Sequence, residues 1–274
     1  MAHGRVIHYK RPCSTPHEIG ERLSMKAPTL FVFNISHYCE KARWALDYFG
    51  IDHVVRPVMV GMHRSIARKL GAKRGSVPFL QTDGGVIAGS SAIIDWCEEH
   101  HSGKRPSLAG EAPDQVRALE KRLDDIAGVH IRRFYYSEAL INDPASVRPI
   151  FSDGLPLWQR AAVTLGWSRI VPIMIKVMDL GPEQGQQSRA LLEAELDWLD
   201  GLLADGRPYL HGSQWTRADL TAAALLGPLV APKEHPMVHA IVIPKAASMA
   251  MQAWSTRPSL QFVRKMYAVH RQRH

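Results

Sequence analysis

The alternation of apolar and polar residues divides the chain into an early part with short strands and a later part with long helices. Residues 29–34 have the apolar and aromatic content of a short buried strand, and residues 53–58 form a second candidate strand. Between them apolar residues recur at helical spacing after Ser36, a suitable N-cap, and Gly50 marks the end of this helix. A strand, helix and strand joined by so few residues predict a parallel crossover.

Two further strands are predicted to form a hairpin. Residues 77–81 and 86–88 are mainly apolar, and the sequence Asp-Gly-Gly at 83–85 between them suits a tight turn. One more helix follows, which Ser90 and Ser91 can cap. The predicted order to this point is βαβ followed by ββα.

After a polar linker the strand patterns disappear, and long stretches with helical periodicity continue to the C-terminus. These stretches share an apolar stripe with a helical period and cover residues 114–140, 157–178, 186–204, 217–230 and 245–268. Thr216 and Asp219 form a capping box at the start of one of them. The predicted fold class is therefore α/β followed by all-α.

Charge is distributed unevenly along the 274 residues. The formal net charge is +8 at pH 7, and the surplus lies in residues 1–27 and 257–274, so the rest of the chain is balanced. Within that balanced part, residues 53–82 contain six basic residues and no acidic one. Neither a zinc-finger spacing nor an aromatic RNA-binding strand accompanies these charges, so we expect no nucleic-acid partner.

The chain also lacks the usual signs of a membrane or secreted protein. Its most apolar long stretch, residues 161–180, contains Arg169, Lys176 and Asp179, whereas a spanning helix needs about 20 mostly uncharged residues. We expect this stretch to be a buried helix and expect no membrane partner. The opening residues contain Glu18 and Glu21 and no continuous apolar region, so no secretory signal is expected.

The cysteines and histidines predict neither a disulfide framework nor a metal site. Cys13, Cys39 and Cys97 form no CxxC pair, which favours a reducing compartment and a cytoplasmic location. His235 and His239 are four residues apart, but a proline lies between them and no third ligand is apparent.

Three short segments carry candidate chemistry. Ser36 and Cys39 lie at a predicted helix N-terminus, where free N–H groups and the helix dipole stabilise an anion such as a thiolate. Ser36 is alternatively only an N-cap, and Cys39, one turn into the helix, is alternatively structural. Pro78 begins a strand, and a cis Val77–Pro78 bond would expose the backbone of Val77, although most such bonds are trans.

The third segment, Ser90 and Ser91, offers hydroxyls and free amides to a carboxylate, or simply caps its helix. Taken together, these segments resemble the glutathione transferase family with a serine-type active site. The resemblance is carried by Ser-x-x-Cys, Ala-Arg-Trp-Ala-Leu, Ser-Val-Pro-Phe-Leu and Ser-Ser-Ala-Ile, and more loosely by the sequence Leu-His-Gly-Ser-Gln-Trp-Thr-Arg-Ala-Asp at 210–219.

The resemblance implies a domain organisation and a cytosolic enzyme. Residues 1–27 would be an N-terminal extension, residues 28–103 a thioredoxin-like glutathione-binding domain, and residues 112–274 an all-α domain. The protein would form a homodimer and use glutathione as co-substrate, with no metal. Its second substrate would be a small hydrophobic electrophile bound between the domains.

The resemblance also implies roles for the candidate residues. Ser36 would hydrogen-bond and activate the glutathione thiol, Pro78 would be cis, and Val77 would pair with the cysteinyl part of glutathione. Ser90, with Ser91 beside it, would bind the γ-glutamyl carboxylate. The electrophile pocket would include some of the aromatic residues of the helical part, of which most are expected in the core: Phe134, Tyr135, Tyr136, Trp158 and Trp167.

Gly89, which departs from the family pattern, and Cys39 keep alternatives open. Gly89 stands where the family usually has Glu, Gln or Asp, which removes one glutathione contact, although basic residues at 68–74 could compensate. A non-catalytic binding protein that holds a hydrophobic ligand or a protein partner is therefore an alternative. A second alternative is thiol–disulfide oxidoreduction through Cys39.

Overall fold

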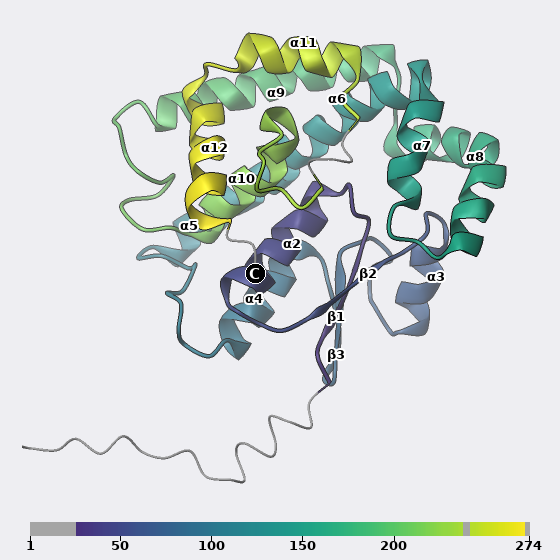
Figure 1. Cartoon of the computed structure of the whole chain (residues 1–274). Coiled ribbons are helices and arrows are strands. Elements are labelled where there is room, and N and C mark those ends of the chain that lie inside the picture. The colour runs from purple at the N-terminus through teal and green to yellow at the C-terminus, as the bar shows by residue number, and fades with distance from the viewer. Residues whose placement is uncertain (1–25, 238–241, 272–274) are drawn as a thin grey trace, which may run out of the picture.

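The computed structural model describes residues 26–237 and 242–271 of the chain (Figure 1). The predicted N-terminal extension, apart from its last two residues, lies outside this range, and so do Cys13, His239 and Arg273.

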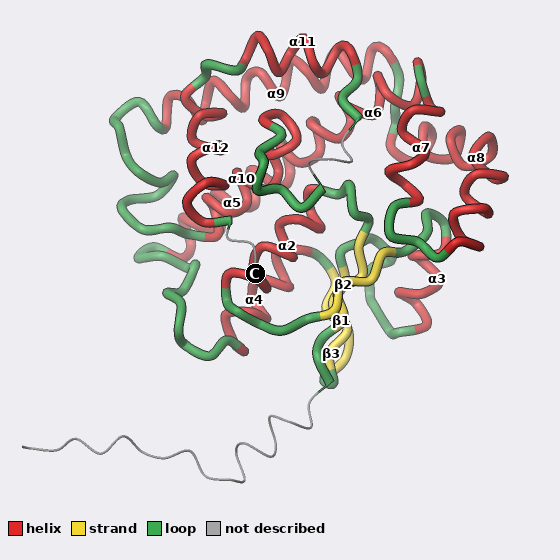
Figure 2. The backbone as a smooth tube through the Cα atoms, viewed as in Figure 1, coloured by secondary structure: helices red, strands yellow, loops and turns green. Residues whose placement is uncertain are grey.

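The first part of the described chain is a thioredoxin-like domain with a mixed sheet (Figure 2). Its sheet has four strands in the order β2-β1-β3-β4. As predicted, the first two strands pair in parallel and the last two form an antiparallel hairpin. The elements are β1 (Thr29–Val32), α2 (His37–Tyr48), β2 (Val54–Pro57), α3 (Met62–Lys69), β3 (Phe79–Thr82), β4 (Gly85–Ala88) and α4 (Ser90–His100).

Alternation along β1 and β3 places helices on both faces of the sheet. Leu30 and Leu80 point into the same core cluster as α2 and α4. Phe31 and Phe79 point the other way, stack with ring centroids 4.7 Å apart, and pack against α3. Because successive side chains of a strand face opposite sides, strands of four residues are sufficient to fix α2 and α3 on opposite faces.

The rest of the described chain is largely helical. Its helices are α5 (Pro113–Asp125), α6 (Ala127–Asn142), α7 (Pro144–Ser152), α8 (Leu157–Met178), α9 (Pro182–Leu202), α10 (Arg217–Val230), α11 (Lys245–Trp254) and α12 (Pro258–His270). Two predictions of a single long helix were wrong, because the chain breaks at Ile126 and again before Pro258. The second break has a clear cause: a residue before proline avoids the helical region, and Arg257 has ψ 139°.

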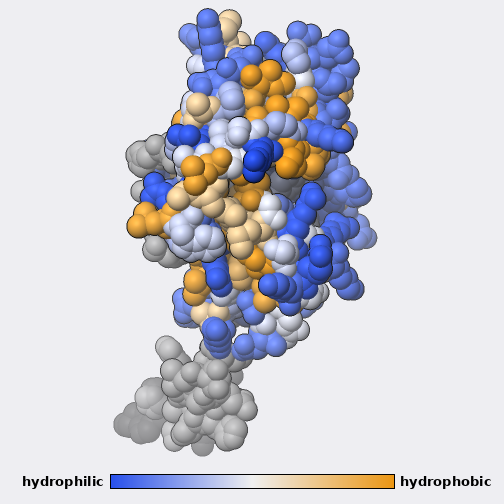
Figure 3. Space-filling view, turned by 90° about the vertical axis from the view of Figure 1, so that its right-hand side faces the viewer, coloured by the Kyte–Doolittle hydropathy of each residue, from blue (hydrophilic) through white to orange (hydrophobic). Residues whose placement is uncertain are grey.

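Helix α8 corrects the expectation that residues 161–180 are buried. Only 22% of its most apolar window is buried, and by length and composition alone it could cross a membrane. Val163, Trp167 and Val171 pack against α6 and α7, but the opposite side meets no other described element. Trp158, expected in the core, is 62% exposed. Figure 3 views the molecule from this side and shows apolar side chains at the surface.

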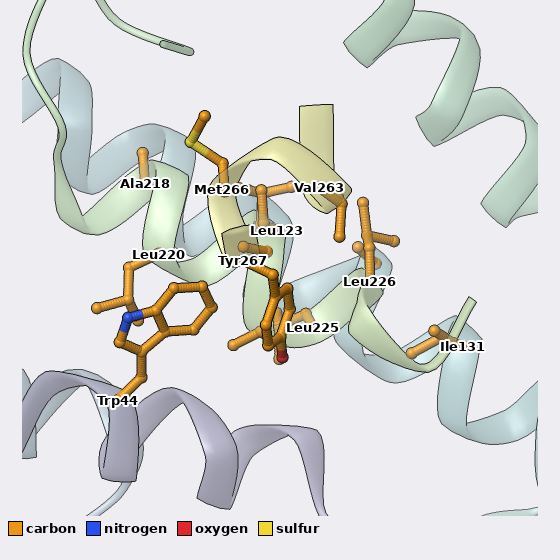
Figure 4. Close-up of a cluster of buried hydrophobic side chains, with 14 of the residues drawn as sticks. Trp44, Leu123, Ile131, Ala218, Leu220, Leu225, Leu226, Val263, Met266 and Tyr267 are labelled. Atoms are coloured by element: carbon orange, nitrogen blue, oxygen red, sulfur yellow. The ribbon is translucent and has the colours of Figure 1, made fainter. Parts of the chain in front are cut away.

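An apolar core joins the two parts (Figure 4). Trp44 of α2 is fully buried against α10 and α12, with its ring centroid 4.6 Å from that of Tyr267. The predicted capping box forms at the start of α10, where Asp219 accepts a hydrogen bond from the Thr216 amide at 2.8 Å. Asp219 also accepts one from the Leu210 amide at 2.6 Å, so a buried carboxylate holds the preceding loop as well.

Buried ion pairs also join the first domain to the helical part. Lys41 of α2 is fully buried, and its Nζ atom lies 2.8 Å from Glu120 and 2.7 Å from Asp124, both on α5. Burial alone would raise the pKa of Glu120, but Lys41 and Arg217 together hold it below its ordinary value. Helix α2 is therefore fixed against the helical part by charge as well as by packing.

The basic C-terminal segment also forms buried ion pairs with the first domain. Arg271 is buried, and its Nε and Nη1 atoms each lie 2.7 Å from a carboxylate of α2, on Glu40 and Asp47 respectively. The indole of Trp44 donates a hydrogen bond to the carbonyl of His270 at 3.3 Å. Part of the charge surplus at this end of the sequence therefore neutralises buried carboxylates of the first domain.

Candidate active site

A cavity of about 380 Å³ lies between the two parts of the protein. The first domain contributes Phe33, Ser36, Arg64 and Val77 to its wall, among others, and α6 contributes Arg132 and Tyr136. The helical side is closed mainly by five apolar residues of α8: Ile170, Ile173, Met174, Val177 and Met178. Its volume falls within the roughly 300–1,000 Å³ that is usual for small-molecule sites.

Ser36 lies on the cavity wall and also caps α2. Its Oγ atom accepts a hydrogen bond from the Cys39 amide at 3.4 Å, which is the N-cap interaction expected from the sequence. A hydroxyl can accept two hydrogen bonds and donate one. The cap uses only an acceptor position, so the Ser36 proton remains available to a group in the cavity.

His37 is buried beside Ser36 and stays neutral. Its Nε2 atom lies 2.9 Å from the Gly128 carbonyl, which can only accept, so this nitrogen carries the proton. Burial, helped by the positive charge of Arg132, lowers the pKa of His37 to about 3. His37 therefore fixes the start of α2 to α6 and is a poor proton acceptor at neutral pH.

Gly128 allows this close approach of α2 and α6. The adjacent Tyr38 donates a hydrogen bond from its hydroxyl to the Asp124 carbonyl at 2.6 Å, and a Cβ atom on Gly128 would overlap that hydroxyl. His37 and Tyr38 thus hold the N-terminus of α2 against the helical part from two sides. Ser36, the residue before them, is positioned by these contacts.

The Val77–Pro78 bond is cis, as the family resemblance implies. Val77 lines the cavity, and Pro78 continues into β3, where its carbonyl accepts a hydrogen bond from the Gly89 amide at 2.9 Å. The structure therefore brings Ser36 and Val77, which are far apart in sequence, to the wall of one cavity.

Ser90 and Ser91 take different places. The N-cap of α4 is Gly89, with φ 98°, rather than either serine, so the prediction that the serines cap this helix was wrong. Ser90 is buried at the first position of α4 and is not part of the cavity wall. The Ser91 hydroxyl accepts from Lys41 at 3.0 Å and donates to Asp124 at 2.9 Å, so it belongs to the ion-pair network.

Cys39 is 1% exposed, and burial raises the pKa of its thiol to about 11. Reactive cysteines have the opposite properties, namely partial exposure and a lowered pKa. Cys97 is likewise buried in the core. The geometry gives no support to redox chemistry at Cys39.

Positive charge faces the cavity from two elements. Arg64 lies on α3 and Arg132 on α6, and the lining includes no Asp or Glu. The Nε atom of Arg132 is buried without a hydrogen-bond partner among the described residues. The basic residues at 68–74, which were expected to compensate for Gly89, are exposed and do not line the cavity.

The sequence did not identify Arg132 or the α8 wall. Arg132 is one of two adjacent arginines, and only the fold shows that the other, Arg133, turns away to Asp179. The α8 residues were recognised as apolar, but their pattern indicated a core helix.

Among residues 26–237 and 242–271, no group of three or more His, Cys, Asp or Glu could hold a metal.

Comparison with known proteins identifies the class of the first domain. Residues 30–105 match the family model described as "Glutathione S-transferase, N-terminal domain". No curated protein matches the chain significantly.

Similar solved structures cover nearly the whole chain. Glutathione transferase GSTFuA3 from Phanerochaete chrysosporium aligns with a TM-score of 0.60 at 17% identity, over 92% of this chain and 99% of that one. Human glutathione-S-transferase T1-1 aligns with a TM-score of 0.54 at 17% identity, over 89% of this chain and 84% of that one. Glutathione S-transferase-I, bound with lactoylglutathione, aligns with a TM-score of 0.53 at 16% identity, over 88% of this chain and 100% of that one. At these identities the likeness shows the fold. The family match itself covers residues 30–105, which form the first domain.

Proposed function

We propose that the protein is a serine-type glutathione transferase that activates the glutathione thiol for attack on a small hydrophobic electrophile. The observation that carries this proposal is the presence of Ser36 and the cis Val77–Pro78 segment on the wall of one cavity. The similarity of the fold to a transferase with bound lactoylglutathione supports glutathione as the co-substrate.

In this proposal glutathione lies along the first domain. The backbone of Val77 pairs with its cysteinyl part, and the free amides at the start of α4, with Ser90, receive the γ-glutamyl carboxylate. Because the Ser91 hydroxyl already bonds to Lys41 and Asp124, only its backbone amide would contribute. The thiol would then lie next to Ser36.

Three features of the cavity favour the ionised thiol. The Ser36 proton can be donated to the sulfur, the N-terminus of α2 has a positive dipole end, and Arg132 places a positive charge on the opposite wall. A hydrogen bond and a positive charge each stabilise the thiolate over the thiol, so both lower the thiol pKa.

The α8 wall supplies the binding surface for the electrophile. Ile173, Met174 and Val177 form an apolar surface across the cavity from Ser36. With 1-chloro-2,4-dinitrobenzene as electrophile, the thiolate sulfur forms a bond to the carbon that carries chlorine. Chloride then leaves with the bonding electrons, and the thiol proton has passed to solvent on ionisation.

Turnover of 1-chloro-2,4-dinitrobenzene by wild type, Ser36→Ala and Ser36→Thr tests the proposal. We expect Ser36→Ala to lose about 10²–10³ in kcat, in line with the removal of one hydrogen-bond donor to a reacting anion. Ser36→Thr keeps the hydroxyl and the cap and should retain much more activity. Equal activity in wild type and Ser36→Ala would remove Ser36 from this role.

A non-catalytic binding protein is the second candidate, and Gly89 favours it. Gly89 provides no side chain for the γ-glutamyl group, and its φ of 98° disfavours any other residue. Calorimetry with glutathione separates the two candidates, since absence of binding at millimolar concentration favours the second.

The cysteine pattern supports a cytoplasmic location for the protein. The family resemblance supports a homodimer, and light scattering measures the oligomeric state.

A further inference from the structure

Helix α8 carries an exposed apolar face on the side away from the core. Trp158 and Ile173 are each 62% exposed and Leu165 is 85% exposed, at spacings that place all three on one side of the helix. Ala161, Ala162 and Pro172 extend the same face and are also exposed. The opposite stripe holds α8 to α6 and α7, so this outer face does not contribute to the fold of the described chain.

The charge of α8 is entirely positive. Arg160, Arg169 and Lys176 are exposed, and residues 157–178 contain no Asp or Glu. None of their three side chains makes a hydrogen bond or ion pair with another residue in the described part of the chain. On α3, Arg68 and Lys69 are also exposed, and their side chains are likewise unpaired among the described residues.

We propose that this face docks on the surface of an anionic lipid bilayer, with α8 lying parallel to the membrane plane. Arg169 and Lys176 share this side of α8 with the apolar residues, and apolar side chains combined with Lys or Arg favour binding at the boundary between headgroups and acyl chains. Trp158, Leu165 and Ile173 enter that boundary. The long side chains of Arg169 and Lys176 extend from the same face to the phosphates.

Charge argues against a second copy of the chain as occupant, and packing argues against a helix that spans the membrane. In a twofold dimer through this face, the cations of one copy would meet the cations of the other, because such an interface is self-complementary. A spanning helix would have to leave α6 and α7, which would expose Trp167 and break its hydrogen bond of 2.7 Å to the Pro144 carbonyl. An anionic surface opposes the cations and leaves that packing intact.

The docked face includes the mouth of the cavity. Ile173 and Val177 are each more than half exposed and also line the cavity, so the cavity opens beside the face that would meet the lipid. Docking would therefore let an apolar electrophile pass from the bilayer to the thiol. This last step rests on the proposed transferase function, whereas docking itself does not.

Co-sedimentation with vesicles tests the docking directly. The full-length protein is mixed with vesicles of phosphatidylcholine alone and of phosphatidylcholine with phosphatidylglycerol, at low and high salt. We expect sedimentation with the anionic vesicles, weakening as salt rises. Leu165→Glu removes one apolar contact with the bilayer and adds a negative charge, so its binding should be at least about tenfold weaker.

A matched variant controls for the added charge. Met249 of α11 is 62% exposed and lies on another helix, so Met249→Glu should bind vesicles as wild type does. Circular dichroism and thermal unfolding check that both variants fold, independently of any enzyme activity. Failure of wild type to sediment with anionic vesicles, or equal binding by Leu165→Glu, would overturn the proposal. A wild-type dimer that Leu165→Glu dissociates would assign the face to a second copy instead.

Discussion

The ammonium group of Lys41 lies 2.8 Å from a carboxylate oxygen of Glu120, and both side chains are buried. Lys41 lies on α2, the helix that Ser36 caps, and Glu120 lies on α5, the first helix of the helical part. The pair therefore fixes the helix that carries the candidate catalytic hydroxyl relative to the part of the protein that closes the cavity.

Replacing Lys41 by Met should lower the free energy of unfolding by about 1–3 kcal/mol, because Glu120 and Asp124 lose a buried hydrogen-bonded cation while Arg217 still pairs with Glu120. Denaturant unfolding measures this loss. The double variant Lys41→Met/Glu120→Gln removes the excess negative charge that the single variant leaves in this network, and Arg217 keeps its pair with Asp95, so part of the stability should be recovered. A loss below about 1 kcal/mol in the single variant would show that the pair does not fix α2.

His37 predicts a specific loss of stability in acid. Its folded pKa of about 3 lies below the usual unfolded value near 6.5, so the unfolded chain binds a proton first as pH falls. The contribution of His37 is complete above about pH 6.5 and declines by about 1.4 kcal/mol per pH unit below it.

The matched variant is His37→Gln, whose amide can still donate to the Gly128 carbonyl but does not titrate. Unfolding measured between neutral pH and about pH 4.5 should show a smaller decline in this variant than in wild type, by about 2–3 kcal/mol. Parallel declines would show that His37 is not buried in its neutral form.

Gly128→Ala should disturb the site at a distance. The new methyl group would overlap the Tyr38 hydroxyl, and the hydroxyl cannot move without losing its bond to the Asp124 carbonyl. We expect a destabilisation of about 1–3 kcal/mol and a rise in the KM for glutathione. Gly166→Ala, where the added Cβ has ordinary contacts, is the control. An unchanged KM in Gly128→Ala would mean that this contact does not position Ser36.

The sequence predicted the first domain well because its signals are local. Strand alternation, the cap at Ser36 and the Asp-Gly turn each depend on a few neighbouring residues, and each element formed close to its expected place. The helical part was less predictable. The break at Ile126 has no proline or glycine at that position, and the exposure of α8 depends on which helices cover it.

In the candidate site, too, residues marked by local motifs were predictable, and residues placed by the fold were not. Ser36 and Val77 were found because short motifs mark them, and both line the cavity. Arg132 has no motif, and the fold alone separates it from Arg133. Ser91 has the expected residue type at the expected place, yet its hydroxyl bonds to Lys41 and Asp124, because residues distant in sequence compete for it.

Arg132 should affect the charge state of the bound thiol. Arg132→Met removes a positive charge from the cavity and should raise the pKa of bound glutathione by roughly one unit, equivalent to about 1.4 kcal/mol. Arg133→Met is the matched control, because Arg133 lies next to it on α6 but pairs with Asp179. The pH dependence of kcat/KM measures the thiol pKa in both variants. Equal shifts in the two variants would contradict a specific role for Arg132.

The most direct test of the central claim is the ionisation of glutathione bound to wild type and to Ser36→Ala, followed by the ultraviolet absorbance of the thiolate as pH is varied. The proposed function predicts that wild type lowers the thiol pKa well below that of free glutathione. It also predicts that Ser36→Ala moves this pKa back toward the solution value while glutathione still binds. A thiol pKa that is the same in both proteins, or that is unchanged from solution in wild type, would contradict the claim.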